Sequence, residues 1–150
     1  RADEAAEVQG LMRGGDSAAA LARAKKAVAA HPQDARLRFL EGVILMDQHR
    51  DAEALAVFQR MTEDFPELPD PYNNIAVLEV RAGHLLLART ALETALRNDP
   101  DHLAARTNLG DVDLMLAIEA WQQAAKARPD DGALQRKLAL ARQILATTAK

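Results

Sequence analysis

The sequence predicts an all-α protein built from repeated helix–turn–helix units, on the evidence of its composition, the spacing of its prolines and the alignment of its small residues. Ala and Leu make up 53 of the 150 residues, whereas Val, Ile and Thr together number 17. Ala and unbranched side chains lose little conformational freedom on entering a helix, and β-branched side chains lose more. The chain is 49% hydrophobic, enough to bury a core, and its length favours one domain.

The prolines recur at a constant interval. Pro32, Pro66 and Pro100 are 34 residues apart, and each follows a run rich in Ala or Leu. Pro129 comes 29 residues after Pro100, so the last interval is five residues short. Proline lacks a backbone N–H and disfavours helix in the residue before it. The prolines therefore predict the ends of successive two-helix units.

Superimposing the units aligns residues of similar size. A small-residue column reads Val8, Gly42, Ala76 and Gly110, a second reads Ala20, Ala54, Ala88 and Ala117, and a bulky column reads Ala24, Phe58, Leu92 and Trp121. Two helices cross closely only where small residues meet, and bulky residues fill the next gap. Each unit needs a neighbour to cover its apolar face, so we expect the units to stack.

This pattern resembles the tetratricopeptide repeat family. The residues that carry the resemblance are Tyr72-Asn73-Asn74-Ile75-Ala76, Asn108-Leu109-Gly110-Asp111 and Ala88…Leu92…Ala95…Pro100. The resemblance implies a right-handed helical solenoid whose concave groove binds a protein or peptide. It divides the single domain, 1–150, into repeats at 1–34, 35–68, 69–102 and 103–131, followed by a C-terminal helix over about 132–147.

A narrower likeness, on Pro71–Leu78 and the Asn-Leu-Gly-Asp stretch, is to proteobacterial envelope-associated repeat proteins. Together with a first residue that is Arg1 and not Met, this likeness favours a periplasmic or cell-envelope location.

The local signals place the helices at about 2–13, 17–30, 34–47, 51–64, 71–82, 85–98 and 132–147. Asp70 before Pro71 predicts an N-cap with proline at the first helical position. Asp130 or Asp131 can cap the last helix in the same way.

The fourth unit departs from the others. Eleven residues separate Ala76 from Ala88, but six separate Gly110 from Ala117, so the residues of the turn are missing. Apolar residues continue at helical spacing across this position. They form two lines, one of Leu109, Val112, Leu116 and Ala120 and the other of Leu114, Ile118, Trp121 and Ala125. We expect one helix over 103–128, about 39 Å long; a tight turn at Asp111–Asp113 is the alternative.

In such a continuous helix Trp121 cannot fold back onto its own unit as Phe58 does, and a wide apolar face is unstable in water. The last helix could cover Trp121 by turning at Pro129–Gly132, or a second copy of the chain could do so by exchanging helices. The sequence therefore predicts a self-association surface in the C-terminal third, formed by Leu114, Ile118, Trp121 and Leu138.

In a solenoid of this family the first helix of each unit lines the groove, and residues at i, i+4 and i+7 share one face. The predicted groove residues are Arg36, Phe39, Val43 and Met46, then Asn73, Asn74, Val77 and Val80, and lastly Thr107 and Asp111. This largely apolar strip would suit an extended peptide or an amphipathic helix. The asparagines and valines can equally be packing residues. Some members of the family that this chain resembles bind a partner's terminal carboxylate with Lys, Arg and Asn side chains in the groove. Such capture is disfavoured here, because the cationic residues are absent from the corresponding positions, which include Ala5, Gln9, Leu40, Asp70 and Asn74.

Composition excludes several functions. A net charge of −3 argues against nucleic-acid binding, which needs a cationic surface. No apolar stretch approaches the roughly 18 residues of a membrane span. The chain has no Cys, its four His lack a recognisable metal-ligand set, and no catalytic constellation stands out. The sequence predicts a non-enzymatic scaffold for protein partners, without a cofactor or metal; a docking or regulatory module of a larger enzyme is the alternative.

Overall fold

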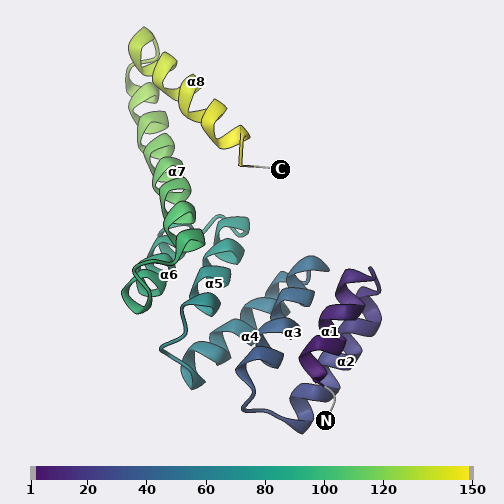
Figure 1. Cartoon of the computed structure of the whole chain (residues 1–150). Helices are drawn as coiled ribbons and strands as arrows, with labels where there is room; N and C mark the ends of the chain where they lie inside the picture. The colour runs from purple at the N-terminus through teal and green to yellow at the C-terminus, as the bar shows by residue number, and fades with distance from the viewer. Residues whose placement is uncertain (1–2, 149–150) are drawn as a thin grey trace.

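A computed structural model describes residues 3–148, which form eight helices and no strand (Figure 1). The helices are α1 (Glu4–Arg13), α2 (Ser17–Ala30), α3 (Ala35–Asp47), α4 (Asp51–Asp64), α5 (Pro69–Arg81), α6 (Leu85–Asn98), α7 (Leu103–Ala127) and α8 (Gly132–Ala146). The all-α prediction is confirmed, and the observed helix ends lie within two residues of the predicted ones.

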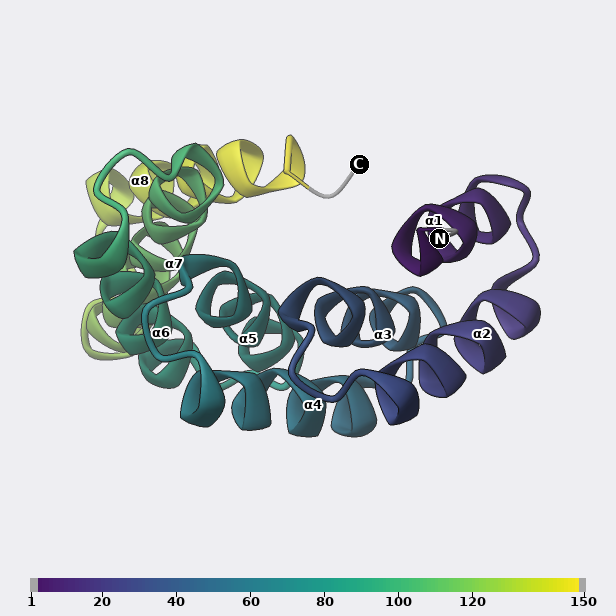
Figure 2. The ribbon, with the colours of Figure 1, turned by 60° about the horizontal axis from the view of Figure 1, so that its bottom comes forward.

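The helices stack as a curved solenoid. Helices α1, α3, α5 and α7 line its inner side, and α2, α4 and α6 form its outer side (Figure 2). Each outer helix packs against the inner helix before it and the inner helix after it. The covered face of each helix pair therefore becomes part of one continuous stack.

The turns within the first three helix pairs share one backbone feature. Gly15, His49 and Gly83, each 34 residues from the next, adopt positive φ angles of 79°, 56° and 81°. Glycine adopts this left-handed conformation without steric cost. Among residues 3–148 no further residue has a positive φ, and the fourth pair has no turn at the corresponding place.

Two of the four inner helices, α1 and α3, begin at an aspartate, but α5 does not. Asp3 and Asp34 accept hydrogen bonds from first-turn N–H groups, and Asp131 does the same for α8, as predicted. The predicted N-cap at Asp70 is wrong. Helix α5 starts two residues earlier, at Pro69, because the first turn needs no N–H donors and accommodates prolines.

Asp70 has another partner. Its Oδ1 lies 2.6 Å from Nε2 of His102, whose Nδ1 accepts a hydrogen bond from the N–H of Ala105 and so caps α7. The Asp70 carboxylate thus links the first turn of α5 to the start of α7.

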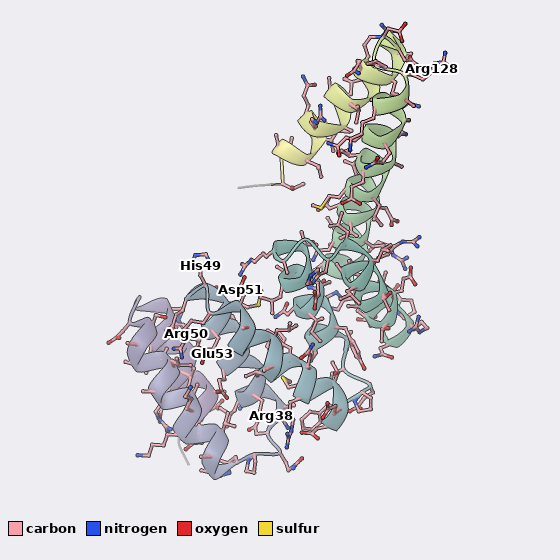
Figure 3. The ribbon with its side chains drawn as sticks, turned by 180° about the vertical axis from the view of Figure 1, so that it is seen from behind. Arg38, His49, Arg50, Asp51, Glu53 and Arg128 are labelled. Carbon is pink, nitrogen blue, oxygen red and sulfur yellow. The ribbon has the colours of Figure 1, made fainter. Side chains whose placement is uncertain are left out.

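The aligned columns meet where the inner and outer helices cross. A Cβ added to Gly42 would lie 2.5 Å from the ring of Phe58, which is fully buried. Arg38, also buried, places its guanidinium 5.3 Å from the centre of the Phe65 ring and 2.7 Å from Asp64 (Figure 3). These contacts close the crossing of α3 and α4, and the approach of the Phe58 ring needs glycine at position 42.

The fourth inner helix is continuous. Helix α7 runs 25 residues, Leu103–Ala127, without a break, which confirms the expected long helix. Its first half packs against α5 and α6. Its second half projects beyond them and pairs with α8 (Figure 1) around a small core of Ile118, Leu138 and Ala141, with Trp121 against its edge. Helix α8 therefore covers the region where the sequence left Trp121 without a partner.

Two glycine substitutions test this packing. Gly42→Ala should destabilise the chain by about 1–2 kcal/mol, because the clash with Phe58 outweighs the gain in helix propensity. Gly110→Ala, measured at low protein concentration, should stabilise it by about 1 kcal/mol, because the structure has nothing within 4 Å of the added methyl group. Urea denaturation of both variants is the measurement, and equal effects would contradict the packing described for Gly42.

Candidate partner-binding groove

The predicted apolar residues of the groove lie on the inner helices at different depths. Phe39, Val43 and Val77 are half-buried and pack against the hydrophobic core formed mainly by α1–α4. The rings of Phe39 and Phe58 lie 5.5 Å apart at their centres. Val80 is half-buried against the core formed by α5, α6 and the first half of α7, whereas Met46 is buried, with 9% exposure. Phe39, Val43 and Val77 thus present partly accessible apolar surface, and Met46 belongs mainly to the core.

Polar pairs also connect successive inner helices. The Arg36 guanidinium donates to both carboxylate oxygens of Asp3, over 2.8 and 3.4 Å, and links α3 to α1. The amide of Asn108 donates to Oδ1 of Asn73 over 3.0 Å and links α7 to α5. With the Asp70–His102 contact, these pairs hold neighbouring inner helices at a fixed spacing.

The remaining predicted residues lie beside these pairs. Asn74 is half-buried on α5, next to Asn73. Thr107 is exposed and Asp111 is half-buried on α7. Because Arg36 is already paired with Asp3, the cation of the predicted set is neutralised within the chain. The described groove residues therefore offer apolar surface edged by amide, hydroxyl and carboxylate groups.

The predicted self-association residues lie on the α7–α8 hairpin. Ile118 and Leu138 are buried against each other, with 7% and 2% exposure. Leu114 and Trp121 are only half-buried, and the Lys137 ammonium lies 5.2 Å from the centre of the Trp121 ring. Within one chain, α8 therefore covers Ile118 and leaves part of Leu114 and Trp121 accessible.

An open pocket of about 900 Å³ lies at the N-terminal end of the stack, and the sequence patterns did not indicate it. Its charged lining includes Arg23, which donates to Glu7 and Glu4. These hydrogen bonds raise the pKa of Arg23, and the bond to Glu7 contributes the most. The second oxygen of Glu4 is buried and accepts no hydrogen bond, and it lies 3.5 Å from His31 Nε2. These residues come from three different segments, so a search along one helix face could not find them.

A separate ion pair lies at the start of α4. Arg50 donates from Nε and Nη2 to Glu53 over 2.9 and 2.7 Å (Figure 3). The hydrogen bonds raise the pKa of Arg50 and lower that of Glu53. This pair joins residues three apart next to the His49 turn, and we assign it to local structure.

The repeat pattern matches a known family model. The model described as Tetratricopeptide repeat matches residues 5–69 and 73–112, which together exceed half of the chain. This chain belongs to the tetratricopeptide repeat (TPR) family. A protein–protein interaction module is therefore its function at the coarse level. The comparison with curated protein sequences gives no match.

Solved TPR structures share the fold. YrrB, described as a TPR protein with an unusual peptide-binding site, is 27% identical, with a TM-score of 0.63 over 67% of this chain and 52% of its own. MamA is 20% identical, with a TM-score of 0.67 over 91% of this chain and 82% of its own. The first TPR of Spaghetti (RPAP3), bound to the HSP90 peptide SRMEEVD, is 18% identical, with a TM-score of 0.54 over 76% of this chain and 97% of its own. The aligned part of this chain spans about half the length of YrrB.

Residues 3–148 of this TPR chain contain neither a membrane span nor a metal-binding cluster. None of the helices in this range has the length and apolar character that a membrane span requires. The same residues contain no group of three or more His, Asp or Glu side chains suited to holding a metal ion.

The Asn73–Asn108 contact can be tested without a ligand. We expect each single change to Ala to cost about 1 kcal/mol, and the pair to be coupled by about 0.5–1.5 kcal/mol, since one hydrogen bond links the two TPR inner helices. A double-mutant cycle by urea denaturation measures the coupling. Asn74→Ala with Asn108→Ala is the control, and additive effects in both cycles would contradict the contact.

Proposed function

We propose that the concave side of this TPR chain binds an extended peptide or an amphipathic helix through apolar anchor residues. The observation that carries the proposal is the partly accessible surface of Phe39, Val43 and Val77 between the polar pairs that connect the inner helices. Apolar anchors from a partner would bury this surface. A partner segment that already has a regular conformation loses less entropy on binding.

The chemistry of the groove favours apolar anchors over an acidic partner. The Arg36 guanidinium is held by Asp3, and Asp70 and Asp111 add negative charge along the same side. An acidic peptide would have to displace Asp3 and would meet like charges. YrrB, with its peptide-binding site, and the Spaghetti TPR, with its bound peptide, support peptide binding as a use of this fold.

Selection from a random peptide library displayed on phage tests the proposal. Peptides selected on the intact chain should carry apolar anchors, and Val43→Asp or Val77→Asp should weaken their dissociation constants at least tenfold, because a charge replaces apolar contact surface. Leu87→Asp, at an exposed position on the outer helix α6, is the matched control. Circular dichroism checks that every variant is folded, and equal binding by groove and control variants would overturn the proposal.

We also propose that the C-terminal third self-associates. The observation that favours this is the partial exposure of Leu114 and Trp121 on a helix whose apolar face α8 covers only in part. A second copy could cover the remainder, and a shortened connection is a known route to helix exchange.

Light scattering tests self-association. One chain has a mass of 16.3 kDa, and the intact protein should show twice that value. Trp121→Ala should shift the equilibrium towards single chains, because it removes the largest apolar side chain of the surface. Gln59→Ala, at an exposed position of the outer helix α4, should leave the mass unchanged. A single-chain mass for the intact protein at all concentrations would contradict the proposal.

A further inference from the structure

The first half of α7 carries a helix-packing face that no helix of residues 3–148 covers. Its residues are Arg106, Gly110 and Asp113, all exposed; at the edge of this face the Asp113 carboxylate accepts a hydrogen bond from Arg89 of α6 over 2.8 Å. In the third repeat the corresponding residues, Tyr72, Ala76 and Glu79, are buried or half-buried under α6. A Cβ added to Gly110 would meet nothing within 4 Å, in contrast to the 2.5 Å contact at Gly42. We call Arg106, Gly110 and Asp113 the bare face of α7.

The residue whose size suits this face lies on the same helix. Across the repeats, the small-residue column of the inner helices and the bulky column of the outer helices compensate in size: where the inner residue is smaller, the outer residue is larger. The pairs are Val8 with Ala24, Ala76 with Leu92, Gly42 with Phe58, and Gly110 with Trp121. Constant packing density requires this compensation. By this pattern, Gly110 is fitted to accept Trp121.

Within one chain the two residues cannot meet. Gly110 and Trp121 lie eleven residues apart in the unbroken α7, about 16 Å along its axis. The contact therefore has to come from a second molecule whose Trp121 approaches the bare face.

Helix α8 does not replace this contact. The outer-helix residues that face the inner helix in the first three repeats are at most 1% exposed; they are Ala20, Ala24 and Ala27, then Ala54, Phe58 and Met61, and then Ala88, Leu92 and Ala95. Their counterparts Ala117 and Trp121 are half-buried, and Ala124 is exposed. Helix α8 packs beside this line, against Ile118, and leaves part of it accessible.

The register of a two-chain contact follows from the other repeats. If two α7 helices lie antiparallel with Gly110 opposite the partner's Trp121, then Leu114 lies opposite the partner's Ala117. The pairs Val80–Ala88 and Met46–Ala54 occupy the equivalent positions in repeats three and two. The two-fold axis passes between Met115 and Leu116, at the middle of α7. One antiparallel pair of α7 helices would thus rebuild two complete inner–outer crossings, one in each chain.

We propose that two copies of this chain pair through antiparallel α7 helices, with each Trp121 packed over the partner's Gly110. This arrangement rests on the self-association proposed above and gives it a geometry. It is isologous, so it closes as a dimer. Helix α8 contacts Trp121 in the single chain, so pairing requires α8 to move around α7 and the dimer forms in a concentration-dependent equilibrium.

Disulfide cross-linking tests the register, since the native chain has no cysteine. Gly110→Cys and Trp121→Cys are prepared as separate chains, mixed and oxidised. The mixture should yield a covalent dimer, whereas each variant alone should not, because identical positions lie about 16 Å apart across the two-fold axis, beyond the reach of a disulfide. A mixture of Asp111→Cys and Gln122→Cys, with the same spacing on other sides of α7, is the control and should cross-link at least tenfold less.

The outcomes separate this geometry from self-association itself. Dimers in light scattering without selective cross-linking of the Gly110→Cys and Trp121→Cys mixture would overturn the antiparallel register and leave self-association standing. Single chains throughout would overturn both. An intrachain disulfide in the double variant G110C/W121C would show that α7 folds back on itself, and would also overturn the paired helices.

A substitution that the single chain accepts gives a second measurement. Gly110→Leu should leave the helix content unchanged, because its surroundings are open in the single chain, but should weaken dimerisation roughly 10- to 100-fold by displacing the partner's Trp121. Gly10→Leu, at an exposed helical glycine of α1, is the matched control. A dimer affinity that is the same for Gly110→Leu and the control would overturn the contact.

Discussion

The structure depends on one kind of contact, the close crossing of an inner and an outer helix at a small residue. At Gly42 the backbone of α3 approaches the ring of Phe58 so closely that a methyl group would not fit. Such an approach buries a whole aromatic side chain, worth about 1.5–3 kcal/mol, and brings the two backbones near enough for the flanking residues to interlock. Because each outer helix also packs on the next inner helix, the same crossing sets the position of the following repeat.

The concave side follows from this stacking. Inner helices that are fixed by the crossings bring residues about 34 positions apart into contact, as in the pairs Asp3–Arg36 and Asn73–Asn108. The polar pairs add little stability where they are exposed. They do determine which groups stay accessible, since a guanidinium held by a carboxylate is a poor site for an anion. The proposed groove is therefore defined as much by internal pairing as by its apolar residues.

Much of the fold could be predicted from sequence, because size compensation and proline spacing are local signals repeated several times. The continuous α7 was predictable for the same reason, since a deletion is visible against three intact repeats. The start of α5 was not, because Asp70 is a good N-cap residue and its contact with His102 comes from a distant segment. Likewise, periodicity assigned Met46 to the groove, but its burial depends on how far α3 is covered by its neighbours. The pocket beside Glu4 and His31 combines segments that no single periodicity connects.

The absence of five residues from the fourth repeat changes the helix packing of the whole C-terminal end. A complete turn would place a left-handed residue after α7's first half, as Gly15, His49 and Gly83 do in the other repeats, and the solenoid would end in a closed pair. Without it, the two halves of one crossing lie end to end on a straight helix, and each half needs a complementary surface. Asp111 lies about 100° around the helix from Gly110, so the groove and the bare face occupy different sides of α7. A dimer formed through the bare face would therefore keep both grooves accessible, and a partner with two binding segments would gain from their fixed separation.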